Sequence, residues 1–210
     1  MATISRYVLA ERIQRVIYNG LPPDDATITI PVINLWINDG LAAAAKKNYT
    51  ESLQIDGVAY MNNSFYTTYK DLAITQDDIG IWKFSLPQIP LGLGKNEGIS
   101  TVQFKGEGKI SFTAIPLSQN QIGYTDSLKQ VPNKIFYWNE GENVYIKTSL
   151  QLSQYKAIVR MVSGGNSNNL DSVINLPDDY IADVVGYVVK MLLTERSQPI
   201  DTTNDGLSKP

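Results

Sequence analysis

The sequence predicts an α+β protein in which helices at both ends of the chain enclose a large antiparallel β region. Apolar residues near the N-terminus recur at three- and four-residue steps, which is typical of amphipathic helices. Between about residues 53 and 162 the pattern becomes strand-like, and glycines and prolines interrupt it at short intervals. One strongly apolar helical pattern follows near the C-terminus. We therefore expect the N-terminal and C-terminal helices to form a helical bundle, with the β region as a sandwich-like insertion.

Two helices are expected in the first quarter of the chain. Residues 4–17 show the period of an amphipathic helix, and Asn19 and Gly20 are usual helix terminators. A second helix is expected over residues 29–47. Pro31 suits its first turn, and the two lysines at its end suit the carbonyl-rich C-terminus.

The middle of the chain is predicted to contain short strands joined by turns. A hairpin is expected around the turn at residues 62–64, and a second around the turn at residues 139–142, where Gly141 is a strong signal. A loop rich in glycine and asparagine follows at residues 164–169. The other strands are predicted at residues 55–58, 79–86, 99–104, 109–115 and 156–162.

The last helix is predicted to begin at Pro177, Asp178 and Asp179, with a proline and two acids in its first turn. Its apolar side chains cover most of its circumference, so we expect its own domain to cover one side and a neighbouring subunit the other. After residue 194 the chain is polar and is expected to form a flexible arm. The candidate subunit-interface residues are Val184, Val185, Val188, Val189 and Leu192.

Four segments follow from these elements. Residues 1–52 hold the N-terminal helices, and residues 53–162 form the β-rich region. Residues 163–194 form a loop and the C-terminal helix, which is expected to pack on the N-terminal helices. Residues 195–210 form the arm.

The composition argues against an enzyme. The 210 residues contain no histidine and no cysteine, so the chain lacks the side chain that normally titrates near neutral pH, a thiolate nucleophile and a soft metal ligand. The remaining carboxylates, lysines, hydroxyls and tyrosines form no recognisable catalytic constellation. We expect no catalytic residues, no cofactor and no metal.

Charge and hydropathy also limit the partners. The chain carries 18 basic and 21 acidic residues, a formal charge of -3, so it does not as a whole attract nucleic acid. No run approaches the roughly 18 apolar residues of a membrane span, and residues 1–6 lack a signal-peptide pattern. We expect no membrane partner, and synthesis in a cytoplasm.

Three short matches to functional motifs are incomplete. The segment around Gly94 and Lys95 would need glycine at Ile89 and a hydroxyl at Asn96 to be a P-loop. Ser153 and Lys156 match the spacing of acyl-serine enzymes, but their companion motifs are missing. A partial calcium pattern, Asn166, Asn168 and Asp171, lacks the glycine of the sharp turn. We interpret all three as turns or loops.

Two surface features have a structural and a functional interpretation. Clustered aromatic residues could stack single-stranded bases, but no basic track accompanies them, so cross-strand packing is favoured. Arg6, Arg12 and Arg15 form a small basic stripe on the first helix, which is more often a solvated face than a DNA contact. The aromatic residues are Tyr60, Phe65, Tyr66 and Tyr69.

The order of elements resembles a tailed-bacteriophage head–tail connector, in particular the neck ring proteins of crAss-like short-tailed phages. The resemblance spans most of the chain and includes the hairpin at residues 136–147 and the strand at residues 157–162. The segments that carry most weight are residues 86–102, with Leu86, Pro87 and Gly98, and the final helix that begins with Pro177 and two aspartates.

The resemblance implies a structural virion protein, a neck or adaptor ring below the portal that extends the DNA channel and docks tail components. It implies a twelvefold homo-oligomer whose partners are the portal protein and other neck or tail proteins, with double-stranded DNA passing through during ejection. The location would be the head–tail junction of the virion, after assembly in the host cytoplasm. The large β insertion and the lack of a basic patch depart from an idealised connector, so the channel-facing residues are not assigned.

The alternative is a β-sandwich module of a virion that binds carbohydrate or a receptor. Trp82, Trp138 and the tyrosines could stack on sugar faces. The apolar terminal helix favours the ring, because a monomeric binding module has little use for it.

Overall fold

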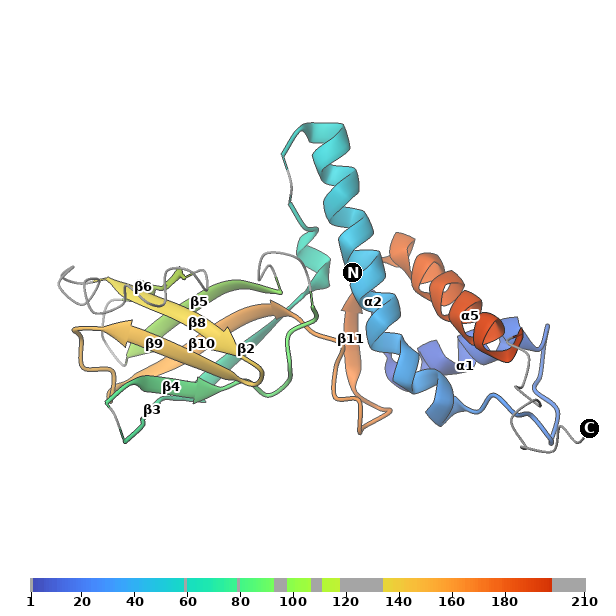
Figure 1. The fold of residues 1–210 in the computed structure, drawn as a ribbon, viewed down its shortest axis with the longest axis horizontal. Coiled ribbons are helices and arrows are strands. Elements are labelled where there is room, and N and C mark those ends of the chain that lie inside the picture. The colour runs from blue at the N-terminus through green and yellow to red at the C-terminus, as the bar shows by residue number, and fades with distance from the viewer. Residues whose placement is uncertain are drawn as a thin grey trace, which may run out of the picture.

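The computed structural model describes residues 2–58, 60–78, 80–92, 98–106, 111–117 and 134–197. The molecule is a mixed α+β protein, which confirms the predicted fold class. Its helical part and its β part lie side by side along the long axis (Figure 1). Each part has its own hydrophobic core.

The chain begins with a strand, β1 (Ala2–Ser5), and the helix α1 (Arg6–Ile17) follows directly. β1 pairs antiparallel with β11 (Val173–Leu176), near the other end of the chain. Ser5 caps α1 by accepting a hydrogen bond from the backbone N–H of Val8. Residues 4 and 5 were predicted to be helical and are not, because they complete this two-stranded sheet.

The second helix, α2 (Ile30–Asp56), ends nine residues later than predicted, at Asp56 instead of Lys47. It ends at Gly57, whose φ of 69° is the left-handed conformation that glycine adopts at helix C-termini. Residues 55 and 56, predicted to lie in a strand, are therefore helical. The short 3₁₀ helix η1 (Asn63–Phe65) replaces the first predicted hairpin.

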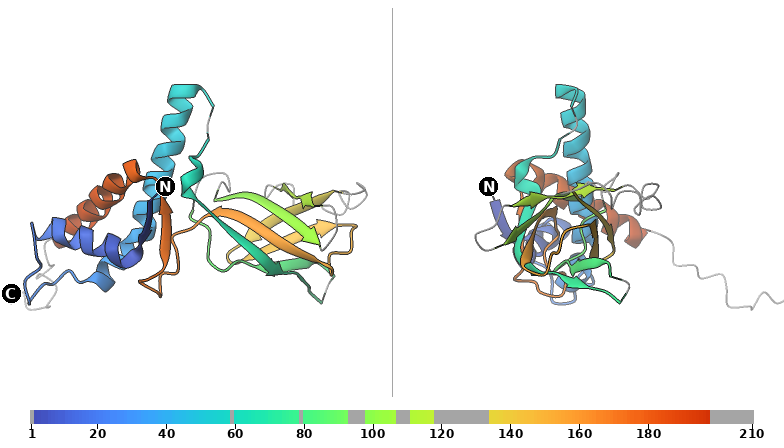
Figure 2. Two further views of the ribbon diagram at one scale, coloured as in Figure 1. Left: turned by 180° about the vertical axis from the view of Figure 1, so that it is seen from behind. Right: turned by 90° about the vertical axis from the view of Figure 1, so that its left-hand side faces the viewer.

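The third helix, α5 (Ile181–Ser197), follows a 3₁₀ turn, η3 (Asp178–Tyr180), close to the predicted start. It packs on α1 and α2 around one core. Gly40 allows the close approach of α2, because an added Cβ would lie 2.8 Å from Val188 Cγ2. The three helices share this core but cross one another in Figures 1 and 2, so an aligned bundle is not evident.

The β part consists of two sheets that face each other across a second core. Phe84 and Phe104, one from each sheet, make an edge-to-face contact in this core at 6.3 Å between ring centroids. In order, the first sheet is β2 (Tyr66–Ala73), β10 (Tyr155–Val162), β5 (Ile99–Gly106) and β6 (Phe112–Thr113). The second is β3 (Thr75–Gln76), β4 (Trp82–Ser85), β9 (Asn143–Thr148), β8 (Ile135–Glu140) and β7 (Ile115–Pro116).

The two sheets join at both edges to form a closed barrel. β2 and β3 are separated by one residue and lie at an edge of different sheets, and the same is true of β6 and β7. Each pair is one strand that crosses from one sheet to the other, so the ring of pairings closes among the described strands. Viewed along the long axis, the strands surround a common interior (Figure 2, right).

The second predicted hairpin, formed by β8 and β9, is confirmed, and so is the strand at residues 156–162. The expected strands at 79–86 and 99–104 are present as β4 and β5, although residue 79 lies outside the described residues. All described strand pairs are antiparallel except β7 with β8. The described part of the predicted strand 109–115 is split between the two sheets.

The predicted segment boundaries shift at both ends of the barrel. Residues 53–56 belong to α2, and Met61 and Phe65 belong to the helical core. At the C-terminus, the first three residues of the predicted arm are the last of α5. The remainder of the arm, residues 198–210, lies outside the described residues. None of the described helices is long and apolar enough to span a membrane.

Candidate interaction surfaces

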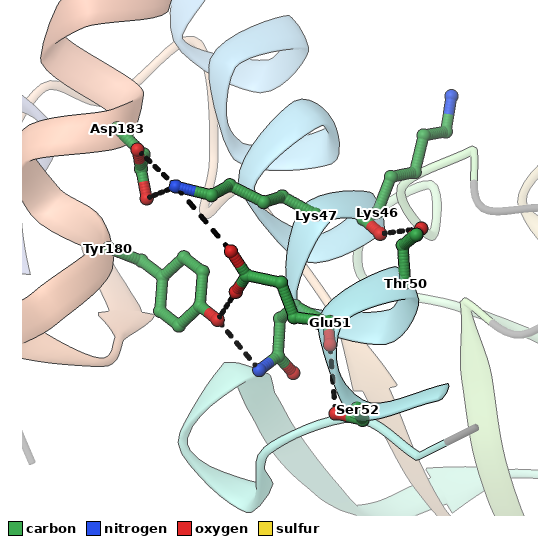
Figure 3. A network of polar contacts seen from close by, with 8 residues as sticks. Lys46, Lys47, Thr50, Glu51, Ser52, Tyr180 and Asp183 are labelled. Carbon is green, nitrogen blue, oxygen red and sulfur yellow. Dashed lines mark hydrogen bonds and ion pairs between the residues drawn. The ribbon is translucent and has the colours of Figure 1, made fainter. Parts of the chain in front are cut away.

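A polar cluster connects the start of α5 to the C-terminal part of α2 (Figure 3). The Tyr180 hydroxyl donates to Glu51 Oε2 at 2.6 Å and accepts from Asn48 Nδ2 at 3.0 Å. Lys47 Nζ donates to both carboxylate oxygens of Asp183, at 2.8 and 2.9 Å. The hydrogen bond to Asp183 raises the pKa of Lys47, while burial, followed by the hydrogen bond to Glu51, raises the pKa of Tyr180. The cluster fixes where α5 lies on α2.

Beyond this cluster, α2 continues into solvent. Asn48 Oδ1 accepts the backbone N–H of Asn62, and Ser52 is the last buried residue of the helix. The remaining turn rises above the rest of the helical part in Figure 1. This turn exposes Leu53 and Ile55, at 48 and 80% of their full surface, together with Asp56. The segment after the helix exposes Val58 and Tyr60, at 65 and 53%.

We call Leu53, Ile55, Asp56, Val58 and Tyr60 the α2 tip. Four of its five side chains are large and apolar, and all four lie within eight residues around the C-terminus of α2. Such a concentration differs from the single exposed apolar residues found on most proteins. Asp56 accepts a hydrogen bond from the Tyr60 hydroxyl at 2.8 Å. The tip has the character of a contact surface.

A second apolar surface lies on the solvent side of α1. Tyr7, Val8 and Val16 are 44, 49 and 48% exposed, and Arg12 and Arg15 are exposed between them. Val8, Arg12, Arg15 and Val16, with Glu11, line a shallow groove of about 380 Å³. We call Tyr7, Val8, Arg12, Arg15 and Val16 the α1 face.

Arg6 does not belong to this surface, although the sequence placed it in a basic stripe with Arg12 and Arg15. It is fully buried, where its guanidinium donates to Asn34 Oδ1 at 2.7 Å and to Asn38 Oδ1 at 2.9 Å. It also donates to the carbonyl oxygens of Asn34, at 2.9 Å, and Gly164. Burial lowers the pKa of Arg6 to about 10.

These contacts make Arg6 the junction between the two parts of the molecule. Gly164 follows the last barrel strand, so one side chain ties α1 and α2 to the exit of the barrel. A side chain at Gly164 would collide with Asn38 Oδ1, which explains the glycine. The position of Arg6, three and four residues before Leu9 and Ala10 on the buried face, was the sequence signal for its burial.

The predicted subunit-interface residues are mostly accounted for inside one chain. Val184 and Val188 are fully buried, and Val185 and Leu192 are 7 and 3% exposed, all in the core shared with α1 and α2. Val189 is half-buried against the same core. The inference that a neighbouring subunit covers these four residues is corrected, because α1 and α2 already cover them. The large apolar residues that α5 exposes are instead Tyr187 and Leu193.

The aromatic residues weighed for base stacking form no common platform. Phe65 is buried in the helical core, edge-to-face with Tyr180. Arg160 covers the ring of Tyr66 at 4.7 Å, and Tyr69 hydrogen-bonds Ser163 inside the junction. Of this group only Tyr60 is mainly exposed, on the α2 tip.

The tryptophans weighed for sugar binding are also buried. Trp82 and Trp138 are each 8% exposed. Trp138 stacks on Tyr145, with 5.6 Å between centroids, and its indole N–H donates to Glu140. Neither indole presents a face to a ligand.

Of the incomplete motifs, the partial calcium pattern lies in a loop, as interpreted. Asn166 and Asn169 accept backbone N–H groups two residues further along, so their side chains stabilise the loop itself. Ser153 and Lys156 lie at the entrance of β10. The P-loop-like residues 93–96 lie outside the described residues. Among the residues that the structure describes, no three potential ligands are grouped to hold a metal.

The α2 tip was missed because residues 55–58 were predicted to form a strand. Gly57, a usual residue after a helix C-terminus, was the signal that α2 runs to Asp56.

No known protein-family model matches the sequence, and no curated protein matches it.

Proposed function

We propose that this chain is a structural virion protein that forms a homo-oligomeric ring in the neck of a tailed phage, below the portal. The ring would extend the DNA channel and dock tail components. The number of subunits, twelve, follows the resemblance to connector proteins. Double-stranded DNA would pass through the ring during ejection without being bound by it.

One observation carries this proposal. Among the large apolar side chains that the helical part exposes, those of the α1 face and the α2 tip form two separate groups, one on α1 and one around the C-terminus of α2. A chain that contacts a neighbour on each of two sides needs two such surfaces, whereas an isolated monomer rarely exposes them. The closed barrel beside them offers further surface to the next component of the neck.

The net negative charge is compatible with a channel component. DNA must slide through a neck, and phosphate contacts that release counterions would slow its passage. A formal charge of -3 per subunit avoids such contacts on average. The proposal therefore needs no basic channel wall.

The tryptophans that suggested the alternative function, a sugar-binding module, are buried. Trp82 packs in the barrel core, and Trp138 packs on the opposite face of its sheet, in a separate cluster with Phe136 and Tyr145. Each side chain is only 8% exposed, so neither indole presents a face on which a sugar can stack. Nothing in the described barrel surface favours this function over the ring.

Electron microscopy of the purified protein, alone and with portal protein, tests the proposal. We expect closed rings, or rings seated on the portal. A protein that stays monomeric over a wide concentration range in both samples would contradict it.

A further inference from the structure

The α1 face and the α2 tip differ in charge as well as in position. The α1 face carries Arg12 and Arg15, and Glu11 beside it pairs with Arg15 at 2.7 Å. Within the described residues no carboxylate forms an ion pair with Arg12, which leaves an exposed guanidinium between two exposed valines. The α1 face is therefore apolar and basic.

The α2 tip is apolar and acidic. Residues 50–60 contain two carboxylates, Glu51 and Asp56, and no lysine or arginine. The tip is also a helix C-terminus, which carries negative partial charge on its free carbonyl groups, and the last turn of α2 contains no basic residue to offset it. Such a helix end favours a cation from outside, and arginine suits it because its guanidinium donates to several acceptors at once.

The two surfaces cannot meet within one chain. α1 packs on the N-terminal half of α2, where Ile33 and Ile37 are fully buried in the shared core. The tip begins about 16 residues further along the same helix, a rise of roughly 24 Å. Figure 1 shows the tip above the level of α1 and α5.

We propose that the α1 face of one copy binds the α2 tip of the next copy. The contact places apolar side chains of the α2 tip beside Val8 and Val16, and Arg12 against Asp56 and the end of α2. Because two different surfaces meet, the contact is heterologous, and repeating it produces a ring where the rotation closes. This inference rests on the proposed ring and assigns its subunit contact.

Two surface variants test the contact. Arg12→Glu with Arg15→Glu reverses the charge of the α1 face, and Leu53→Asp with Ile55→Asp disrupts the α2 tip. All four side chains are exposed, so circular dichroism and thermal melting are expected to match the wild type. Each variant alone is expected to be monomeric in sedimentation velocity. Ile89→Asp, at a residue 60% exposed outside both surfaces, is the control and is expected to assemble normally.

Mixing the two variants gives the decisive result. The α1-face variant keeps an intact tip and the α2-tip variant keeps an intact face, so each mixed pair can make one contact. We expect heterodimers and nothing larger, because the second contact of each chain is disabled. A mixture that contains only monomers would overturn the assignment.

A charge exchange examines the proposed pair of charges. Arg12→Glu alone is expected to weaken self-association by at least about tenfold, and adding Asp56→Arg to the same chain is expected to restore most of the loss.

Rings that form normally in the face and tip variants would overturn the contact and leave the ring proposal standing. Rings that form but no longer bind portal would assign the disabled surface to portal instead. A wild type that never assembles contradicts both proposals.

Discussion

Arg6 is a charged side chain buried among neutral partners, at the point where three segments of the chain meet. Four hydrogen bonds to amide and carbonyl oxygens replace the water it loses. A buried charge without its hydrogen bonds is costly, and so are acceptors left without a donor. At the residue scale, the junction between the helical part and the barrel depends on this one guanidinium.

Replacing Arg6 by methionine is expected to lower the free energy of unfolding by about 3 kcal/mol, because the acceptors of Asn34, Asn38 and Gly164 lose their donor. Arg6→Lys is expected to recover only part of the lost stability, since an ammonium group cannot reproduce the planar hydrogen-bonding geometry of a guanidinium. Urea unfolding measures the free energy of unfolding of both variants. Arg12→Met, at an exposed position, is the control and is expected to change stability by less than about 0.5 kcal/mol. Equal effects of the two methionine variants would contradict the role of Arg6.

Tyr137 gives the molecule a pH dependence at alkaline pH. Burial raises the pKa of Tyr137 to about 12 in the folded state, above its ordinary value of 10.0. Because the unfolded chain loses this proton first, its contribution to stability is complete below pH 10 and is lost as the pH rises to about 12. Between pH 9 and pH 11 this loss amounts to about 1.3 kcal/mol, and Tyr137→Phe is expected to remove it. The wild type and the variant are compared by urea unfolding at pH 9 and pH 11. Arg6, whose pKa is lowered in the folded state, makes stability change with pH in the opposite direction. Because both proteins contain Arg6, its contribution cancels in the comparison. Parallel pH profiles would refute the prediction.

At the scale of elements, the local sequence pattern predicted whether most segments are helix or strand. Where each segment begins and ends depends also on the distant segments that it contacts. The β8–β9 hairpin was predictable because its turn residues lie beside its strands in sequence. β11 was not, because its pairing with β1 joins residues about 170 positions apart. Similarly, the apolar circumference of α5 indicated that it is covered, but not that α1 and α2 cover most of it.

The crossing of α2 and α5 gives a prediction in which two effects oppose each other. Gly40→Ala gains helix propensity of about 1 kcal/mol, but its Cβ would meet Val188 Cγ2 at 2.8 Å and Val184 Cγ1 at 3.1 Å. Valine has essentially one χ1 rotamer in a helix and cannot turn away. Overpacking costs about 1–3 kcal/mol, so we expect a net loss of about 1 kcal/mol.

Gly186→Ala in α5 is the matched control, since nothing lies within 4 Å of the added Cβ. It is expected to stabilise the protein by about 0.5–1 kcal/mol. Thermal melting of both variants checks the pair. Adding Val188→Ala to Gly40→Ala should relieve the clash but leave a small cavity. Stabilisation by Gly40→Ala alone would show that the helices separate more easily than their packing indicates.

At the scale of the whole molecule, the composition limited the function classes, and the fold then separated core residues from candidate contact surfaces. The choice of Val184, Val185, Val188 and Leu192 as interface residues was wrong, because periodicity alone does not distinguish burial by the same chain from burial by another. Val185→Asp is therefore expected to disrupt the fold itself, with loss of the cooperative thermal transition. A folded but monomeric variant would contradict this expectation.

The C-terminal arm belongs to the same scale. Deletion of residues 198–210 removes a polar segment with little apolar area, so circular dichroism and the melting temperature are expected to remain near wild type. Incorporation into the head–tail junction is expected to fall, because an arm repeated in every subunit adds avidity for a neighbouring ring. Normal occupancy in particles would contradict the docking role, and unfolding would place the arm in the core.

The chain enters and leaves the barrel at adjacent points. Tyr66 opens β2 and Val162 ends β10, and the two are partners in the antiparallel register. A short turn between them would therefore span the gap left by residues 67–161, although Leu91, which lies in this segment, packs in the helical core. In evolutionary terms, the barrel is an exchangeable module: a lineage can alter or replace what it presents to the next component while the helices retain their own contacts.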